Sequence, residues 1–241
     1  MSASVEVKNL YYSYPDGQPA LRDISFSIAE NEVLGIIGPN GAGKSTLLMH
    51  LNGLLQAGSG SVTVGEHRVA EANLKLIRRQ VGLVFQNPDD QLFSPTVFDD
   101  AAFGPLNLGM KAEEVQATVK SVLEKVGLAG YAHRSSHHLS LGEKRRLAIA
   151  CVLAMSPSVL ALDEPTSFLD PGGKWQLISL LRALPGAKII ASHDLELVGR
   201  VCHRVLLMDR GQVIAEGPVE AMLRNRPMLA AHGMAESMGT G

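Results

Sequence analysis

Two hydrophobic patterns alternate along the chain. Runs of apolar residues without alternation are typical of parallel strands covered on both faces; they are EVLGII (32–37), QVGLVF (80–85), SVLALD (158–163) and AKIIAS (187–192). Near the N-terminus, segments 5–14 and 21–28 alternate apolar and polar residues, which predicts strands with one solvated face. Segments of helical length follow at 44–55 and 172–184. Together these patterns predict an α/β fold.

The pattern changes between about Ser94 and Met155. Segments 111–128 and 141–155 are amphipathic at helical spacing, with no strand pattern between them. Beyond the last buried run, RVLLMDRGQVIAEG predicts a hairpin that turns at Arg210-Gly211. The helical stretch therefore reads as an insertion into an α/β core.

We expect a single domain over residues 1–241 with three parts. Residues 1–90 and 157–225 would form the α/β core, which has an antiparallel β edge. Residues 91–156 would form the inserted α-helical subdomain. Residues 226–241 would form a C-terminal tail, and its last dozen residues, which are rich in Met, Ala and Gly, are expected to be frayed.

Composition narrows the possible classes of protein. Apolar residues make up 46% of the 241 positions and charged residues 19%, which argues for a sizeable core and against disorder. The net charge of -2 gives no basic excess that would indicate nucleic-acid binding, although local basic patches stay open as an alternative. Cys151 and Cys202 have no metal-ligand or paired spacing, so we expect buried thiols in a reducing compartment.

The chain also carries no pattern for entering a membrane. Its first residues, MSASVEVKNL, are too polar for a signal peptide. No apolar run approaches the roughly 20 residues that span a bilayer. Membrane association is therefore expected to need a partner protein.

A glycine-rich loop is the strongest chemical signal. GPNGAGKST matches G-x-x-x-x-G-K-[ST] between a buried strand and a helix, the context that this phosphate-binding motif requires. Its glycines let backbone N–H groups curl around a triphosphate at a helix N-terminus. A chance match in this length is on the order of one in a hundred. The predicted ATP-binding residues are Gly38, Pro39, Asn40, Gly41, Ala42, Gly43, Lys44, Ser45 and Thr46.

The side chains of this loop have distinct expected roles. Lys44 would reach the β- and γ-phosphates, and the Ser45 hydroxyl would ligate Mg²⁺. Further along, the run SVLALD ends in Asp163, and Glu164 follows it. Because ligands bind at the carboxyl ends of strands in α/β sheets, Asp163 would hold Mg²⁺ through water and Glu164 would polarise the attacking water. Without other signals, two acids at this place would be interpreted as solvated residues that end a strand. Because the chain also contains the phosphate loop, a catalytic role is the favoured interpretation.

The segment HHLSLGEKRRLAIA predicts a capped helix. Ser140 is a good N-cap, and the helix start behind it offers N–H groups to an anion. By itself this would be an ordinary helix N-terminus. Its position about twenty residues before the Asp163–Glu164 strand gives it weight.

Taken together, these segments resemble the ATP-binding subunits of ABC transporters. GPNGAGKST is similar to the Walker A loop of that family, VLALDE to Walker B, and LSLGE to the signature usually written LSGGQ. Leu141 replaces a Gly of the signature and Glu143 replaces its Gln. Nearly the whole chain is covered, so the resemblance implies a P-loop NTPase (RecA-like) core.

Single residues complete the resemblance. Gln86 stands where the family has its Q-loop glutamine, and SFLD (167–170) is similar to its D-loop. His193, in ASHD, resembles the switch histidine. Tyr14 stands where the family carries an aromatic that stacks on adenine, although Tyr11 and Tyr12 are nearby and a core aromatic is the alternative.

The resemblance implies a head-to-tail homodimer that sandwiches ATP. Each subunit would contact the ATP of its partner through Ser140, Leu141, Gly142, Glu143 and Asp170. Within one subunit Glu164, His193, Gln86 and Lys44 would be catalytic, and Mg²⁺ would be held by Ser45, Gln86 and Asp163. An extra charge at Glu143 is expected to weaken dimer closure slightly.

The stretch FQNPDDQLFSPTVFDDAAFGP resembles the Q-loop region of the energy-coupling-factor subclass, most closely its cobalt/nickel branch. This implies a transmembrane coupling protein and a substrate-binding membrane subunit, with the chain at the cytoplasmic face of the plasma membrane. Arg residues of the coupling protein would meet Asp89 and Asp90, beside a rim of Gln91, Leu92 and Phe93. Alternatively, the two acids are solvated turn residues.

Several alternatives stay open. Cobalt is the favoured cargo, nickel comes second and a vitamin third, and the chain could pair with a paralogue. A soluble ABC ATPase acting on ribosomes or DNA is less favoured because the chain has neither a second ATP module nor a long coiled-coil insertion. A P-loop kinase or GTPase would lack the signature helix and the His193 switch.

Overall fold

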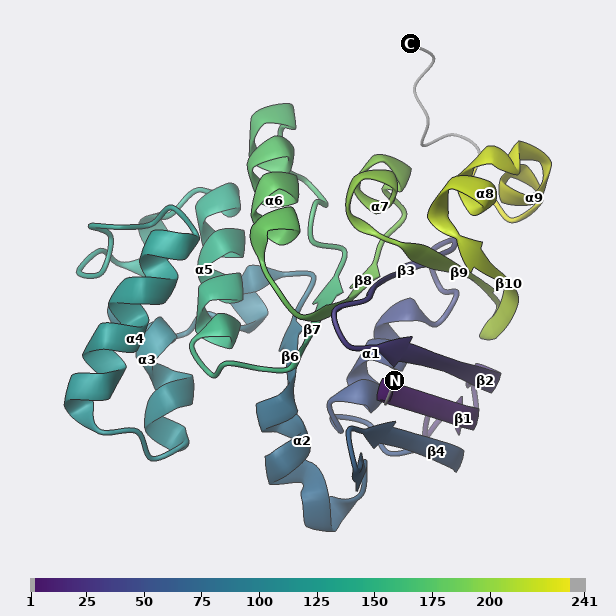
Figure 1. The fold of residues 1–241 in the computed structure, drawn as a ribbon, viewed down its shortest axis with the longest axis horizontal. Coiled ribbons are helices and arrows are strands. Elements are labelled where there is room, and N and C mark those ends of the chain that lie inside the picture. The colour runs from purple at the N-terminus through teal and green to yellow at the C-terminus, as the bar shows by residue number, and fades with distance from the viewer. Residues whose placement is uncertain (1–2, 235–241) are drawn as a thin grey trace. The chain divides into compact units, whose positions relative to one another are not determined.

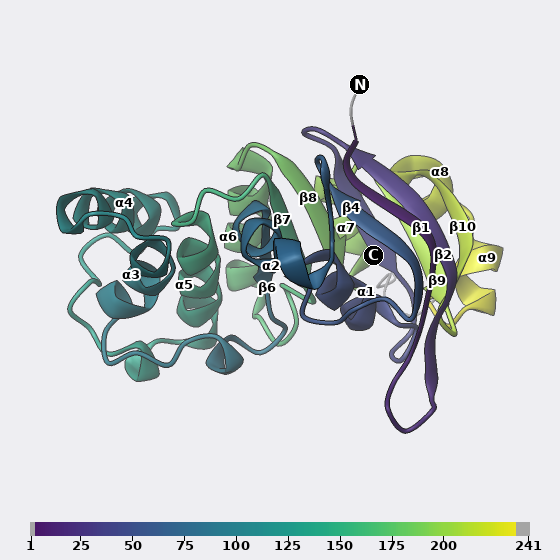
Figure 2. The same ribbon diagram turned by 90° about the horizontal axis from the view of Figure 1, so that it is seen from below.

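The computed structural model describes residues 3–234, which divide into two compact units. The first unit contains the chain up to Leu83, Ser158–Glu164 and the chain from Pro185 onward. The second contains Val84–Pro157 and Pro165–Leu184. Figures 1 and 2 label most of the helices and strands of both units. The second unit thus includes segment 165–184, which the sequence pattern assigned to the α/β core.

A six-stranded sheet forms the centre of the first unit, in the order β10-β9-β3-β8-β7-β6. Its strands are β3 (Val33–Ile37), β6 (Val81–Val84), β7 (Val159–Asp163), β8 (Ala187–Ala191), β9 (Arg204–Asp209) and β10 (Gln212–Pro218). β3 pairs in parallel with β8 and β9, and β7 pairs in parallel with β8. Every residue of β3, β7 and β8 is buried, as the continuous apolar runs predicted.

A second, antiparallel sheet has the order β2-β1-β4-β5 and forms the predicted β edge. Its strands are β1 (Ala3–Ser13), β2 (Pro19–Ala29), β4 (Ser59–Val64) and β5 (His67–Arg68). The helix α1 (Lys44–Leu51) contacts strands of both sheets and buries Leu47, Leu48 and Leu51 completely. The position of this helix fixes the loop that precedes it.

Shorter helices complete the first unit. They are α2 (Leu74–Gln80), α7 (Leu195–Val201), α8 (Val219–Arg224) and α9 (Arg226–Ala231), with a 3-10 turn at Glu71–Asn73. The expectation of a frayed C-terminal tail is wrong for the residues up to 234. Leu229 and Met234 are buried, and His232 Nδ1 lies 2.8 Å from Asp209 Oδ2, so the chain is packed as far as residue 234. The rest of the predicted tail, 235–241, lies outside the described residues.

The predicted hairpin is confirmed. β9 and β10 are antiparallel, with Asp209 opposite Gln212. Arg210 and Gly211 between them both have positive φ, as tight two-residue hairpin turns require.

The prediction that Cys202 is a buried thiol is also confirmed. Burial raises the pKa of the Cys202 thiol to about 12.

The second unit is helical, as the insertion pattern predicted. It contains α3 (Val97–Asn107), α4 (Ala112–Lys125), α5 (Leu141–Leu153) and α6 (Pro171–Ala183), with 3-10 turns at Pro88–Asp90 and Ser136–His138. The helix α5 packs against α3, α4 and α6 (Figure 1). The helix α3 was not predicted; its buried residues Val97, Ala101 and Ala102 form only a narrow apolar stripe.

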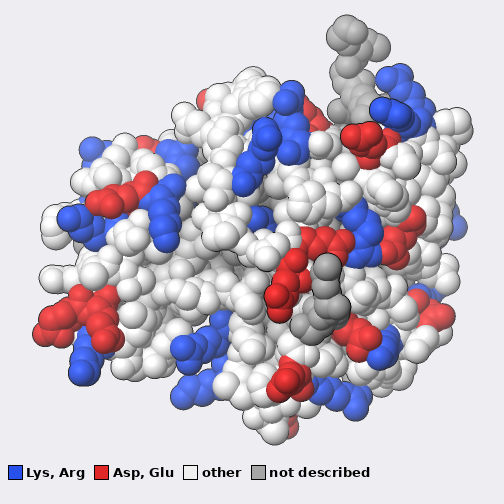
Figure 3. Space-filling view, in the orientation of Figure 1, with Lys and Arg blue, Asp and Glu red and all other residues white. Residues whose placement is uncertain are grey.

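The distribution of charged residues and the length of the helices agree with what the sequence led us to expect. On the face in Figure 3, acidic and basic residues are interspersed, as the near-zero net charge leads one to expect. Within residues 3–234, no helix has the length and apolar character needed to cross a bilayer.

The turn before α3 depends on one buried carboxylate, that of Asp100. Its Oδ1 accepts hydrogen bonds from the backbone N–H groups of Phe93 (3.0 Å) and Ser94 (2.8 Å). The neighbouring Asp99 is exposed and accepts from the Thr96 hydroxyl at 2.6 Å. Adjacent acids therefore have very different environments.

We predict that Asp100→Ala lowers the free energy of unfolding by about 2–3 kcal/mol, because it leaves the buried N–H group of Ser94 and the part-buried N–H group of Phe93 without an acceptor. The matched variant Asp99→Ala should cost under about 1 kcal/mol, because its interactions are exposed to solvent. Urea unfolding followed by circular dichroism measures both. Equal losses in the two variants would contradict this assignment.

Candidate nucleotide-binding and hydrolysis site

The loop 38–44 is packed too closely for side chains at two of its glycines. Gly38 has φ 152°, and a Cβ there would lie 2.1 Å from the carbonyl oxygen of Met208 in β9. Gly43 has φ 99°, and its Cβ would lie 2.7 Å from the carbonyl oxygen of Ala20 in β2. Both obstacles are backbone atoms, so the loop lies directly on the two sheets.

The loop ends in a helix start that suits an anion. Gly43 is the N-cap of α1 and provides no side-chain acceptor. The first N–H groups of a helix have no intrahelical partner and carry the positive end of the helix dipole. This geometry, with a glycine-rich approach, is that of a phosphate site.

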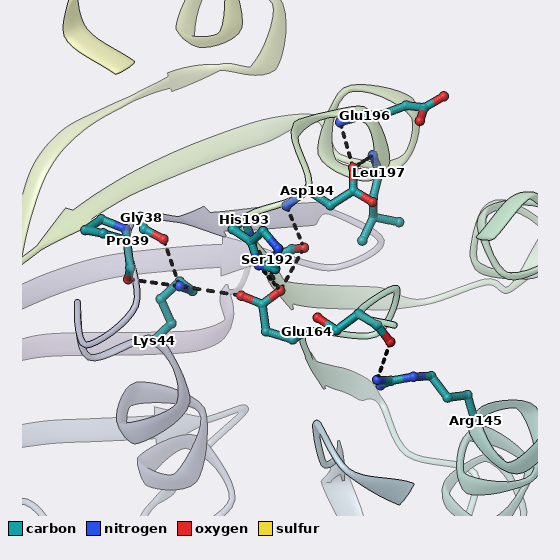
Figure 4. Close-up of polar contacts among 11 residues, drawn as sticks. Gly38, Pro39, Lys44, Arg145, Glu164, Ser192, His193, Asp194, Glu196 and Leu197 are labelled. Atoms are coloured by element: carbon teal, nitrogen blue, oxygen red, sulfur yellow. Dashed lines mark hydrogen bonds and ion pairs between the residues drawn. The ribbon is translucent and has the colours of Figure 1, made fainter. Parts of the chain in front are cut away.

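Lys44 is buried at this loop and lies among acceptors. Its Nζ donates to the carbonyl oxygens of Gly38 (2.8 Å) and Pro39 (3.2 Å). The same ammonium group lies 3.5 Å from Glu164 Oε1. The phosphate loop and the carboxylate after β7 therefore meet through one cation, as Figure 4 shows.

Glu164 is held in an unusual conformation by its neighbours. Its φ of 44° is left-handed, and its N–H donates to the Ala191 carbonyl at 2.8 Å. Its Oε2 accepts from the Ser192 hydroxyl (3.2 Å) and from the His193 backbone N–H (3.3 Å), and lies 2.8 Å from His193 Nδ1. Such strain in a non-glycine residue is typical of functional sites.

Ser192 is a residue that sequence reasoning missed. It is fully buried, donates to Glu164 and accepts from the Asp194 N–H at 3.0 Å. The side chain of Asp194 in turn caps α7 by accepting from the N–H groups of Glu196 and Leu197. The signal was present in ASHD, where a hydroxyl residue ends a buried strand directly before the predicted histidine.

The predicted magnesium ligands fit that ion by chemistry. Asp163 is the buried last residue of β7, and Ser45 lies in the first turn of α1, which contacts β7. Both offer oxygen atoms, which Mg²⁺ prefers. No group of three or more His, Cys, Asp or Glu side chains in the described residues could hold a metal alone. A cation that shares its ligands with phosphate oxygens would not need one.

Tyr14 lies beside the phosphate-loop helix. Its hydroxyl is 2.8 Å from Thr46 Oγ1, and its ring meets that of Tyr12 edge to face at 5.2 Å. Tyr12 in turn packs edge to face on the buried His50, at 4.6 Å. The aromatic next to the loop is therefore Tyr14, whereas Tyr12 packs further along α1.

In the second unit the signature segment forms a closed cap. The N–H and the hydroxyl of Ser140 both donate to Glu143 Oε2 at 2.8 Å, and the N–H of Glu143 points back to Ser140 Oγ at 3.4 Å. The backbone N–H of Ser140, followed by its hydroxyl, lowers the pKa of Glu143. Leu141 begins α5 and is not among the positive-φ residues, as expected of a bulky side chain.

The D-loop segment packs against this cap within the same unit. The carboxylate of Asp170 accepts from the Gly173 N–H at 2.6 Å and caps α6. Arg145 donates to the Ser167 carbonyl at 2.8 Å, which joins α5 to the segment. A Cβ on Gly142 would lie 3.9 Å from Leu169, so the two predicted in-trans segments are neighbours.

The predicted docking rim needs correction. Leu92 is only 5% exposed and belongs to the core of the unit. Gln91 is also turned inward, because its amide accepts from the Phe85 N–H (3.4 Å) and donates to the Ala148 carbonyl in α5 (2.8 Å). Sequence reasoning missed this because the amide and the Leu follow two exposed acids in a segment without periodicity.

Other residues of that stretch are accessible. Gln86 is exposed directly after β6. Asp89 lies 2.6 Å from Lys144, yet 58% of its side chain is exposed, and Asp90 accepts from Asn87 at 3.2 Å. Phe93 is 62% exposed and meets the exposed Phe103 edge to face at 4.9 Å. This surface of Asp89, Asp90, Phe93 and Phe103, called the acidic-aromatic surface below, combines carboxylates with aromatic rings.

The phosphate loop, its buried lysine and the adjoining carboxylates define a P-loop nucleotide-binding protein. Comparison with known proteins narrows this class. The family described as ABC transporter matches residues 21–167, more than half of the chain. The chain is 51% identical over 230 residues to a putative ABC transporter ATP-binding protein of Gloeobacter violaceus, covering 95% of this chain and 94% of that one.

Other relatives point to a branch of this family. The energy-coupling factor transporter ATP-binding protein EcfA of Methanothermobacter thermautotrophicus is 49% identical, with 93% of this chain and 74% of that one covered. The structure of CbiO1 from Clostridium perfringens, part of the ABC transporter complex CbiONQ, superposes with a TM-score of 0.85 at 36% identity, covering 96% and 94% of the two chains.

A more distant match is the dimeric structure of the ATP-binding cassette MJ0796 bound to ADP and Pi. Its TM-score is 0.80 at 27% identity, with 89% of this chain and 98% of that one covered. The chain belongs to the ABC transporter family, as an ATP-binding ATPase subunit of the energy-coupling-factor type. The predicted fold is confirmed with it.

Proposed function

We propose that this chain hydrolyses ATP in a head-to-tail homodimer and thereby powers uptake of a transition-metal ion, with cobalt favoured. The observation that carries the proposal is the buried Glu164 carboxylate, which is held between Lys44 and His193 at the phosphate loop. This arrangement places the ammonium group of Lys44, which can bind phosphate, next to the carboxylate of Glu164, which can accept a proton from water.

ATP binding would exchange one partner of Lys44. The triphosphate lies along the loop 38–46, and Lys44 leaves Glu164 for the β- and γ-phosphates. Glu164 stays in place because Ser192 and the backbone of His193 hold its other oxygen. The Oε1 oxygen of Glu164 then accepts a proton from the attacking water as that water bonds to the γ-phosphorus and the bond to the β-phosphate oxygen breaks, which yields ADP and inorganic phosphate.

Magnesium would act together with the nucleotide. Ser45, Asp163 and Gln86 are the residues that would hold Mg²⁺, which supplies charge neutralisation on the β- and γ-phosphates. The His193 side chain, beside Glu164, would hold the γ-phosphate. Tyr14 would stack on adenine after giving up its bond to Thr46.

A second copy would close the site through the signature. Ser140, Leu141, Gly142 and Glu143 present the start of α5, a helix N-terminus that suits a γ-phosphate, and Asp170 lies in the neighbouring segment. In this chain the Ser140 hydroxyl donates to Glu143. It must therefore turn away from a carboxylate in order to donate to phosphate, so Glu143 opposes closure. The MJ0796 structure, a dimer bound to ADP and Pi, supports the association of two copies.

The membrane partner is proposed to dock on the acidic-aromatic surface. Carboxylates bind Arg in charge-assisted, often bidentate pairs, and exposed rings add apolar area. Asp89 already pairs with Lys144 of α5, so an Arg that takes over this carboxylate would alter the signature helix. The chain would then work peripherally, at the cytoplasmic face of the plasma membrane.

We expect Glu164→Gln to bind ATP but to turn it over about 10²–10⁴-fold more slowly, because the amide cannot accept the proton of water. The measurements are phosphate release and fluorescent-nucleotide binding on the purified chain with Mg²⁺. The variant should also accumulate as an ATP-bound dimer. Near-normal turnover would exclude Glu164 as the base.

Asp89→Ala with Asp90→Ala should uncouple uptake from ATP hydrolysis in the assembled transporter while leaving nucleotide binding by the isolated chain intact. The control is Glu113→Ala with Glu124→Ala, which removes two exposed acids from α4. Recovery of membrane proteins with the tagged chain, together with uptake in cells, measures both. Unchanged recovery and uptake in the Asp89/Asp90 variant would refute docking at these acids.

The cargo is tested with the membrane proteins that co-purify with the chain. Cells that express the set should accumulate cobalt only when Glu164 is intact, as measured by elemental analysis. Nickel accumulation would replace the metal in the proposal, and uptake of a vitamin instead of either metal would reject metal import. ATP hydrolysis stimulated by nucleic acid rather than by membrane partners would favour a soluble role.

A further inference from the structure

Four side chains beside the phosphate loop form a closed set of contacts. The Tyr14 hydroxyl lies 2.8 Å from Thr46 Oγ1, and the Tyr14 ring meets the Tyr12 ring edge to face, with 5.2 Å between the centroids. Tyr12 meets the ring of His50 in the same manner at 4.6 Å, and His50 Nδ1 lies 2.8 Å from the Thr46 carbonyl oxygen. The contacts therefore run from Thr46 through three rings and back to Thr46.

His50 is the fixed end of this set. It is only 1% exposed and lies in the last turn of α1, one helical turn after Thr46. Because a carbonyl oxygen only accepts, Nδ1 of His50 carries the proton and donates it to the Thr46 carbonyl. Burial lowers the pKa of His50, so the ring is neutral at pH 7. A buried ring that is bonded to its own helix offers Tyr12 a surface of fixed orientation.

The orientation of the Tyr14 ring depends on two supports. The hairpin turn after β1 fixes the backbone of this residue, since its N–H donates to the Gln18 carbonyl at 2.9 Å. The side chain is held by the Thr46 hydroxyl and by the Tyr12 ring. Thr46 belongs to the phosphate-binding segment, so a phosphate group competes for its hydroxyl. Tyr14 is still 36% exposed, which leaves ring area for a base.

We propose that Tyr12 and His50 are positioning residues that hold the ring of Tyr14 in place to stack on the adenine of ATP. The inference rests on the proposed role of Tyr14 in adenine stacking. A phosphate that takes over the Thr46 hydroxyl removes one support of Tyr14. The Tyr12 ring, itself packed on His50, provides the other. Adenine then meets a side chain whose rotation is already restricted, which lowers the entropic cost of binding.

The test compares ADP with pyrophosphate by calorimetric titration of the chain and its variants in the presence of Mg²⁺. Both ligands suit the phosphate loop, but only ADP carries a base. Tyr14→Ala should weaken ADP binding about tenfold or more, because one base stack is lost. Tyr12→Leu and His50→Leu keep apolar volume and should each weaken ADP binding by about three- to tenfold, the size of one aromatic contact. Pyrophosphate should bind all three variants as it binds the parent.

Three controls separate positioning from a general structural role. Tyr12→Phe keeps both ring contacts and should bind ADP like the parent. Tyr11→Leu removes the neighbouring ring of β1, which is 44% exposed, and should leave both affinities unchanged. A residue that acts only through Tyr14 has no further effect once that ring is gone. Tyr12→Leu combined with Tyr14→Ala should therefore bind ADP as weakly as Tyr14→Ala alone.

The outcomes are distinct. If Tyr14→Ala binds ADP normally, adenine stacking and the positioning role both fail, whereas hydrolysis at Glu164 is tested separately. If Tyr14→Ala binds ADP weakly but Tyr12→Leu and His50→Leu bind it normally, the positioning role is overturned and stacking stands. An equal loss of pyrophosphate binding, or a further loss in the double variant, also overturns it, because the residues would then support the loop itself. Failure of both Leu variants to fold would count in the same way.

Discussion

The site depends on the way Glu164 leaves the sheet. Its N–H is bonded to the Ala191 carbonyl, so the pairing of β7 with β8 continues for one residue beyond β7. The left-handed φ at this residue then turns the chain. The carboxylate is thereby held over the end of β8, where Ser192 and His193 bind one oxygen and Lys44 approaches the other. The strained backbone at Glu164, which costs free energy, therefore places its carboxylate next to the ammonium group of Lys44.

In the helical unit, too, a few polar side chains fix the backbone of the residues proposed to be functional. One buried guanidinium, that of Arg145, connects the signature helix to the segment that leads into α6. Carboxylates cap the starts of both helices, Glu143 within the box at Ser140 and Asp170 at α6. Surfaces proposed to meet a second copy are thus fixed before any partner arrives, which lowers the entropic cost of association.

Much of this could be predicted from the sequence because two kinds of signal are local. Continuous apolar runs specify buried strands, and GPNGAGKST specifies a loop whose chemistry requires its glycines. The helix α3 was missed because Pro105 and a narrow apolar stripe blur its period. The inward turn of Gln91 and Leu92 was missed for another reason. Their partners, such as the Ala148 carbonyl, lie 57 positions away, and no pattern within a segment encodes such a contact.

The close packing of the phosphate loop also limits how this chain can change. At Gly38 and Gly43 the atoms that would collide with a side chain are the carbonyl oxygens of Met208 and Ala20. A clash with a side chain can be relieved by shortening that side chain elsewhere in the sequence. A clash with the main chain offers no such remedy, because every amino acid carries the same carbonyl. A side chain at either position would thus require the backbone of β9 or β2 to move, which no substitution of the residues facing the loop provides by itself.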